Sequence, residues 1–443
     1  MTDDAGGQPL EARPGLLELT DAFARIGLVS FGGPAGQIAL MHRVVVDEKR
    51  WLDEPRFLHA LNYCMLLPGP EAMQLATYVG WLMHGVRGGL IAGLLFVMPG
   101  ALVLLGLSIV YLVAADVGFV QGLLFGLKAA VLAVVAEAIV RLSRRSLTTG
   151  WQLALAIVAF AGVAFLKLPF PAIVLGAAIC GVLCQGFVSS GEKGTASDVS
   201  PVTGAGAQWW GFLRTSAAWI AIWLAPLGLL YLAVGREHVW TQMASFFSVM
   251  AAVSFGGAYA LLGWVAQQAV EVHGWLRPDE MLTGLGLAET TPGPLILVLL
   301  FVGFLGGARL SDLEPLLGGT IGALVALWFT FATSFLFVFA GAPFIERLRH
   351  LRWLSAALAG VTAAVVGVIA NLALWFGLQV LFDKTYEVAA GPLRIPVPEP
   401  SSINVAAALI ALAAGIALIR FKVNMIAVLA ASAIAGMIWV VLT

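Results

Sequence analysis

Two short motifs in this chain combine hydrogen-bond donors with residues that interrupt a helix, and each motif occurs twice. Ser-Phe-Gly-Gly begins at Ser30 and again at Ser254, and Pro-Gly-Pro begins at Pro68 and again at Pro292. The differences 254 − 30 and 292 − 68 are both 224, and the Trp-Leu pair at Trp51 recurs with the same offset. Helix breaks at matching positions of two repeats are typical of the binding site of a secondary transporter.

The Pro-Gly-Pro motif must interrupt an apolar helix. Proline removes a backbone donor and clashes with the preceding turn, and glycine costs about 1 kcal/mol inside a helix. Pro70 is well placed as the first residue of a new half-helix, which leaves the amides of Glu71 and Ala72 unpaired in the break. Pro294 stands in the same position in the second copy. Such a helix start can bind an anion, and a structural kink is the alternative.

The paired glycines that follow each serine suit an anion as well. Gly32-Gly33 and Gly256-Gly257 permit positive φ, so that successive amides can form a concave nest of donors to which the serine hydroxyl adds. The alternative is close helix packing through small residues, which membrane proteins favour.

Charged residues inside apolar segments cost roughly 2.5 kcal/mol or more each at mid-bilayer, so each is a functional candidate. Arg25 precedes the first break and could be the fixed cation that meets an anion, unless it pairs with Asp21. Lys128 lies on the opposite helix face from Glu137 and therefore needs another partner or an anionic ligand. Glu137 is expected to pair with Arg141.

Two glutamates flank the Pro-Gly-Pro breaks. Glu71 follows the first break, and Glu289 precedes the second, next to the neutral donor Thr291. A carboxylate beside an anion site would repel a dianion unless it were protonated, which predicts proton coupling. For Glu71 the alternative is a role in capping the half-helix dipole.

The composition identifies an integral membrane protein. Hydrophobic residues make up 60% of the chain, charged residues only 11%, and the mean hydropathy is +0.95. The three cysteines lie within apolar segments and the histidines have no ligand spacing, so we expect no metal site. No nucleotide-binding motif occurs, and we therefore expect no cofactor and no nucleic-acid partner.

The apolar runs predict an all-α, polytopic membrane protein of about 11–13 transmembrane or re-entrant helical elements. We divide the chain into a tail (1–15), a first repeat (16–188), a linker (189–211), an extra transmembrane helix (212–235) and a second repeat (239–443). The predicted elements are 16–42, 57–84, 88–114, 117–140, 151–167, 170–188, 212–235, 239–267, 281–306, 315–340, 353–382, 403–419 and 422–442.

The second repeat should enter the membrane upside down. Six elements and the extra helix, an odd number, separate equivalent points of the two repeats. The basic clusters that mark the cytoplasmic side, at 141–145 and 347–352, follow the fourth element of the first copy and the third element of the second. If the first two elements both cross the membrane, the basic loop at 43–56 lies outside, against the positive-inside rule. It would agree if both were re-entrant hairpins broken at Gly-Gly and at Pro-Gly-Pro, and the sequence leaves this choice open.

The same motifs resemble the chromate ion transporter family in its long, two-domain form. The resemblance rests on the stretches Phe23 to Pro34, Leu66 to Ala72 and Glu289 to Pro294, and it extends over nearly the whole chain. Members are multi-pass inner-membrane proteins that export chromate, with sulfate as a similar oxyanion. Met65 stands where many members have Gln, and Ala258 replaces the proline that follows Gly-Gly in the first copy.

We therefore expect a secondary transporter that exports chromate or a similar tetrahedral oxyanion across the inner membrane, driven by an ion gradient, with protons as the coupling ion, through rocking of the inverted halves. An uncoupled anion channel and a sulfate-type permease are the alternatives, an enzyme is not expected, and a homodimer stays open. The predicted substrate-binding residues are Arg25, Ser30, Gly32, Gly33, Pro68, Gly69, Pro70, Glu71, Lys128, Ser254, Gly256, Gly257, Glu289, Thr291, Pro292, Gly293 and Pro294.

Overall fold

The computed structural model describes residues 14–184, 205–255, 258–342, 352–390 and 393–442. Helices form nearly all of it, and six are long and apolar enough to cross a membrane, which confirms an all-α, polytopic membrane protein. The α-helices are α1 (Leu16–Leu28), α2 (Gly33–His42), α3 (Glu54–Leu66), α4 (Glu71–Ala114), α5 (Gly118–Ser146), α6 (Gly150–Ala164), α7 (Phe170–Leu183), α8 (Ala205–Ala233), α9 (Val239–Ala252), α10 (Ala258–Ala266), α11 (Pro278–Thr290), α12 (Val298–Leu310), α13 (Pro315–Gly341), α15 (Arg352–Leu381), α16 (Val405–Gly415) and α17 (Met425–Leu442).

The remaining elements are short. A two-stranded antiparallel hairpin, not foreseen from the sequence, joins α15 to α16, and single helical turns of π or 3-10 type extend several helices. They are η1 (Arg43–Glu48), η3 (Gln267–Val272), η4 (Leu295–Leu297), β1 (Thr385–Ala390), β2 (Leu393–Pro398), η6 (Pro400–Ser402) and η7 (Ile416–Arg420).

The helices follow the predicted apolar runs, and the predicted breaks are real. The glycine motif separates α1 from α2, and Pro-Gly-Pro separates α3 from α4 and α11 from η4 and α12. The helix α4 turns sharply at His84 and Gly85, where the sequence predicted two elements. The extra helix α8 begins at Ala205, before the predicted boundary at 212, because the Ala-Gly-Ala-Gln run ahead of Trp209 continues its helix.

The repeated motifs have repeated local structure. The π-helical segments η1 and η3 begin 224 residues apart, at Arg43 and Gln267. Each is followed by a matching bond, from Lys49 N–H to the Val44 carbonyl and from His273 N–H to the Gln268 carbonyl, both 2.9 Å long. The sequence duplication therefore extends to the hydrogen bonds of the backbone.

Both broken elements of the first repeat fold back on themselves. Lys49, which follows η1, forms a 2.8 Å ion pair with Glu18 in the first turn of α1. His84, at the end of the first part of α4, bonds to the Pro14 carbonyl at 2.7 Å. Each element thus returns to the end of the molecule from which it started, which is the geometry of a re-entrant hairpin.

In the second repeat, contacts also join the two parts of each broken element, and in α11–α12 they join its two ends. Trp275, which follows η3, packs on Phe246 and Phe247 in the middle of α9. Arg309 at the end of α12 makes a two-bond ion pair with the buried Glu280 in the first turn of α11. Such fork-to-fork bonds fix both angle and distance, so they hold the ends of α11 and α12 together.

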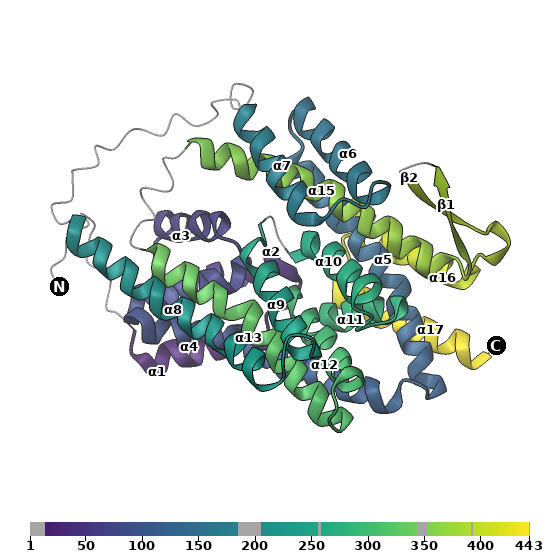
Figure 1. Cartoon of the computed structure of the whole chain (residues 1–443), viewed down its shortest axis with the longest axis horizontal. Coiled ribbons are helices and arrows are strands. Elements are labelled where there is room, and N and C mark those ends of the chain that lie inside the picture. Colours follow the sequence, from purple (N-terminus) through teal and green to yellow (C-terminus); the bar gives the residue numbers. More distant parts are fainter. Residues whose placement is uncertain (1–13, 185–204, 256–257, 343–351, 391–392, 443) are drawn as a thin grey trace.

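The two repeats do not form two separate bodies. One bundle contains α1, α4, α8, α9, α12 and α13, and the other contains α5, α6, α7, α15, α16 and α17. Each bundle draws on both repeats, and α10 and α11 pack between them. Figure 1 places α1 and α3 toward one end of the long axis and the hairpin and the C-terminus at the other. The two repeats are therefore interleaved, with helices of each in both bundles.

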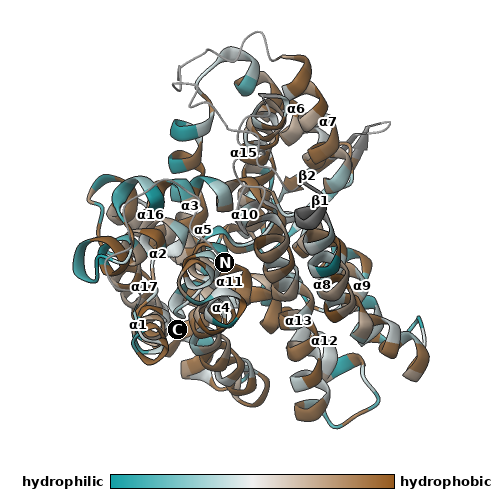
Figure 2. Ribbon diagram, turned by 90° about the vertical axis from the view of Figure 1, so that its left-hand side faces the viewer, coloured by the Kyte–Doolittle hydropathy of each residue, from teal (hydrophilic) through white to brown (hydrophobic). Residues whose placement is uncertain are grey.

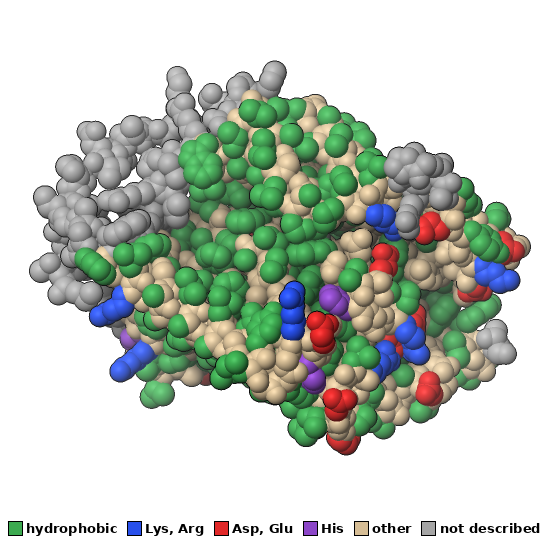
Figure 3. All heavy atoms as spheres, in the orientation of Figure 1, with side chains coloured by type: hydrophobic (Ala, Val, Ile, Leu, Met, Phe, Trp, Pro, Cys, Tyr) green, Lys and Arg blue, Asp and Glu red, His purple; other side chains and the backbone are tan. Residues whose placement is uncertain are grey.

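The outer surface suits a bilayer. Hydrophobic residues dominate the helices in Figure 2, and hydrophilic ones gather near their ends and connections. In Figure 3 hydrophobic side chains cover a broad area of one face, and charged side chains are few and lie mostly on its right-hand half. Inside, glycines let helices meet closely: Gly80 touches Gly88, and Gly303 touches Gly322.

Candidate binding site at the crossed helix breaks

The breaks of the two repeats are hydrogen-bonded to each other. The Gly69 amide of the first Pro-Gly-Pro donates to the Ser254 carbonyl of the second glycine motif, at 3.0 Å. The equivalent bond with the repeats exchanged runs from the Gly293 amide of the second Pro-Gly-Pro to the Ser30 carbonyl of the first glycine motif, at 2.8 Å. The two repeats thus meet twice through equivalent bonds, each of which joins the Pro-Gly-Pro of one repeat to the glycine motif of the other.

Glycine is required at the centre of each Pro-Gly-Pro. Gly69 has φ of +127° and Gly293 has φ of +95°, a region that side chains rarely adopt. A Cβ on Gly69 would also lie 2.6 Å from the Gln74 amide nitrogen and 2.9 Å from the Ser334 hydroxyl. The backbone can approach these polar groups only because the residue has no side chain.

A small closed cavity lies beside this crossing. It has a volume of about 20 Å³, and its mostly apolar wall is formed by Gly69, Pro70, Met250, Ala251, Ser254, Leu261, Ile296 and Thr330. This is room for about one water molecule. Pro70 and Ile296 stand at the starts of α4 and of the helix η4–α12, whose first amides have no acceptor within their own helix. Both half-helices therefore begin at the cavity, and the breaks are closed against each other.

Several buried hydroxyl groups around the breaks have no partner among the protein atoms that the structure describes. They belong to Ser30, to Thr330 in the cavity wall and to Ser334 beside Gly69. Thr330 and Ser334 lie one turn apart on α13 and are 3% and 0% exposed. Burying an unpaired hydroxyl costs about 1–3 kcal/mol, so three of them at one crossing indicate a place for a polar ligand.

Two buried glutamines, both from the first repeat, support the crossing. Gln37 donates to the carbonyls of Gly293 and Ser30, and Gln74 donates to the Pro68 carbonyl at 2.7 Å. Their equivalents 224 residues later are Leu261 and Val298. Sequence reasoning gave no weight to Gln37, although an amide inside an apolar element is a signal for a site.

The two glutamates lie next to the breaks, as predicted. Glu71 is the first residue of α4, where its charge favours the helix start. Glu289 is 4% exposed and accepts a 2.6 Å bond from the hydroxyl of Tyr259, a residue that the sequence did not single out. The hydroxyl of Thr291 is buried too but bonds back to the Ala288 carbonyl at 2.9 Å.

The predicted cations are not at the crossing. Lys128 forms a 3.2 Å ion pair with Asp279 on α11, which is the partner that its position on α5 required. The prediction that Lys128 binds substrate stays a prediction. Arg25 is exposed on α1 and does not line the cavity. Glu137 pairs with Arg141 at 3.4 Å, as expected. The site is therefore built from neutral donors.

The other predicted residues are distributed around the crossing. Gly32 and Gly33 both have positive φ, but Gly32 is exposed, and neither glycine lines the cavity. The Pro292 carbonyl packs against Gly100 of α4, and Pro294 caps η4. Gly256 and Gly257 lie outside the described residues.

These features define a class: a polytopic membrane protein in which the broken helices of two sequence repeats meet at their breaks, an arrangement that many secondary transporters share. The chain belongs to the chromate transporter family, which it matches over residues 17–182 and 241–437. The resemblance noted from the sequence is thereby confirmed.

Named relatives cover most of the chain. A chromate transport protein of Pseudomonas aeruginosa is 32% identical over 358 residues, which are 80% of this chain and 79% of the relative. A probable chromate transport protein of Synechococcus elongatus is 27% identical over 408 residues, 88% of this chain and 94% of the relative. No solved structure matches the chain significantly.

Proposed function

We propose that this protein transports chromate, or a similar tetrahedral oxyanion such as sulfate, across the inner membrane. The observation that supports this most strongly is the set of unpaired hydroxyls beside two helix starts, at the bonds from Gly69 to Ser254 and from Gly293 to Ser30. Neutral donors and helix starts hold anions without a fixed cation. The names of the relatives point to chromate as the substrate. We propose no enzymatic activity.

The anion would enter by separating the crossed breaks. A cavity of about 20 Å³ cannot hold an ion with four oxygens, so the crossed breaks must first move apart from each other. That motion would release the amides of Gly69 and Gly293 from the serine carbonyls, and both amides would then be free to donate to the anion. A site that is closed in one state and open in another favours a carrier over an uncoupled channel.

Re-entrant ends support an inverted orientation of the repeats. If both broken elements of the first repeat return to their starting side, the basic loop at 43–56 lies on that side. The second part of α4 then crosses the membrane, and α5 crosses back, so that Arg141 and Arg145 lie on the same side as this loop. The loop between α16 and α17, with Arg420 and Lys422, falls there by the same parity. The positive-inside rule makes this side cytoplasmic.

We propose that movement of the anion is coupled to protons through Glu289 and Glu71. A buried carboxylate whose close partner is a tyrosine hydroxyl would repel a dianion unless it took up a proton. Binding of the anion and of the proton would then favour each other, which couples their movements.

Vesicles test this proposal. In inverted membrane vesicles, labelled chromate or sulfate should accumulate against its concentration gradient when a pH gradient is present. A Glu71→Gln, Glu289→Gln double variant should lose accumulation, whereas Glu48→Gln, at an exposed glutamate of η1, should keep it. Strictly downhill flux would contradict the carrier proposal, unchanged accumulation in the double variant would contradict coupling through these residues, and no movement of either anion would contradict the substrate.

A further inference from the structure

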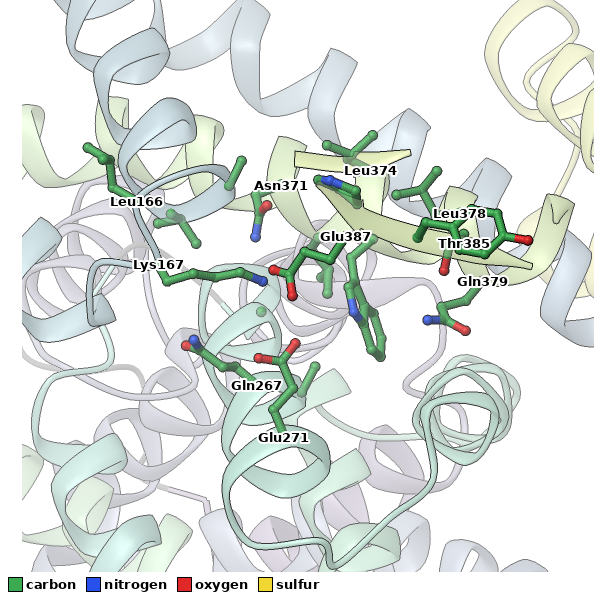
Figure 4. Close-up of a pocket in the computed structure, with 18 residues that line it drawn as sticks. Leu166, Lys167, Gln267, Glu271, Asn371, Leu374, Leu378, Gln379, Thr385 and Glu387 are labelled. Atoms are coloured by element: carbon green, nitrogen blue, oxygen red, sulfur yellow. The ribbon is translucent and has the colours of Figure 1, made fainter. Parts of the chain in front are cut away.

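A second, much larger cavity lies at the hairpin end of the molecule. Its volume is about 760 Å³, and it is bounded by the α6–α7 turn, α10 and η3, α15 and the hairpin (Figure 4). The hairpin wall is anchored: the Tyr386 hydroxyl donates to Glu399 at 2.8 Å, and the Asn404 amide donates to the Leu381 carbonyl at 2.8 Å.

The wall carries charge and hydrogen-bonding groups. Lys167 comes from the α6–α7 turn, Gln267 and Glu271 from η3, Asn371 from α15 and Glu387 from β1. Figure 4 shows the Lys167 side chain extending among the other four. One lysine faces two glutamates here, which gives this part of the wall a formal charge of −1.

One short helix separates this cavity from the closed site. Leu261 of α10 lines the small cavity at the crossed breaks, whereas Gly263 and Ala266 of the same helix line the large one. Because α10 packs between the two bundles and against α15, a movement of α10 relative to α15 would change the barrier between the two cavities.

We propose that the large cavity is the outer vestibule of the anion pathway and binds the oxyanion weakly at Lys167; this rests on the proposed function. The ammonium and the amides of Gln267 and Asn371 are donors that suit an oxyanion. Glu271 and Glu387 repel a dianion at close range and lower its affinity there. A vestibule of this kind lets an exported anion leave rather than bind again.

A thiol reporter tests the vestibule. Gln379 lines the cavity and is exposed, so Gln379→Cys, in a variant with Cys64, Cys180 and Cys184 replaced by Ala, should react with a membrane-impermeant thiol reagent applied to the outer side. Sulfate should slow that reaction several-fold. Sulfate is used because chromate would oxidise the thiol.

The charge variants give the direction of the effect. In the Gln379→Cys reporter, an additional Lys167→Gln should abolish the protection of the thiol by sulfate. An additional Glu271→Gln with Glu387→Gln should lower the sulfate concentration that gives half of the full protection several-fold. The matched control Lys384→Gln changes an exposed lysine that does not line the cavity, and it should leave protection unchanged. Equal reaction rates with and without sulfate, in protein that still transports an oxyanion, would overturn the vestibule; failure of the unmodified protein to transport any oxyanion would instead overturn the proposed function.

Discussion

At the scale of single residues, the groups at the crossed breaks that we propose to bind the anion are neutral. The sequence drew attention to Arg25 and Lys128, because charge in an apolar segment is easy to see. Lys128 instead pairs with Asp279, and Arg25 is exposed on α1. Long-range ion pairs of this kind depend on which helices pack together, and spacing along one helix does not contain that information.

The polar residues at the crossing were harder to recognise. Ser30, Gly69 and Glu289 were predicted from their motifs, whereas Thr330 and Ser334 belong to an ordinary apolar helix and carry no motif. Hydroxyl residues are common in transmembrane helices, where most bond to their own backbone. Only the three-dimensional arrangement shows that these two do not.

This assignment predicts the effect of removing the hydroxyls. A hydrogen bond to a charged ligand contributes about 1.5–3 kcal/mol, so Thr330→Val with Ser334→Ala should raise the half-saturation concentration for sulfate transport about tenfold or more. The melting temperature should rise, since neither hydroxyl has a protein partner to lose and each is costly to bury unpaired. Transport titrations and melting curves of purified protein measure both quantities.

The matched control is Ser108→Ala. Ser108 is equally buried, but its hydroxyl already donates to the Leu104 carbonyl at 2.7 Å. Its replacement should leave the half-saturation concentration unchanged. Equal effects of the control and the test variants would mean that the α13 hydroxyls have no special role.

At the scale of elements, the breaks were the most predictable features of the chain. Proline and glycine act locally, so the starts of α4 at Glu71 and of η4 at Leu295 follow directly from Pro-Gly-Pro. Whether the broken elements cross or turn back was not predictable, because that depends on contacts such as Lys49 with Glu18 and Arg309 with Glu280.

The re-entrant geometry predicts which side each loop faces. Asp47 in η1 and Asp312 between α12 and α13 are exposed. If the broken elements are re-entrant, Asp47→Cys and Asp312→Cys should react with impermeant thiol reagents from opposite sides of the membrane. If those elements all crossed, parity would put both residues on the same side. Labelling of intact cells and of inverted vesicles decides between the two, and same-side reaction would refute the re-entrant assignment.

At the scale of the whole molecule, the duplication folds into two interleaved bundles, not two halves. The α5 helix of the first repeat packs on α15 and α17 of the second, and α4 packs on α12 and α13. The sequence indicated the repeats through a constant offset of 224 residues, but helix packing across repeats leaves no such trace. At the crossed breaks, the two repeats contribute equivalent backbone groups, whereas their side chains differ, as with Gln37 and Gln74 in the first repeat and Leu261 and Val298 in the second.

The central claim is that the crossed breaks bind a tetrahedral oxyanion. Tungstate has the same shape and charge as chromate, and its metal scatters X-rays strongly and anomalously, so the most direct measurement is the position of bound tungstate in crystals of this protein. We predict an anomalous peak within hydrogen-bonding reach of the Gly69–Pro70 turn, Ser254 and the Thr330 hydroxyl, with the Gly69 to Ser254 bond broken. A peak at Arg25 or Lys128, with the crossing intact and unoccupied, would contradict the account.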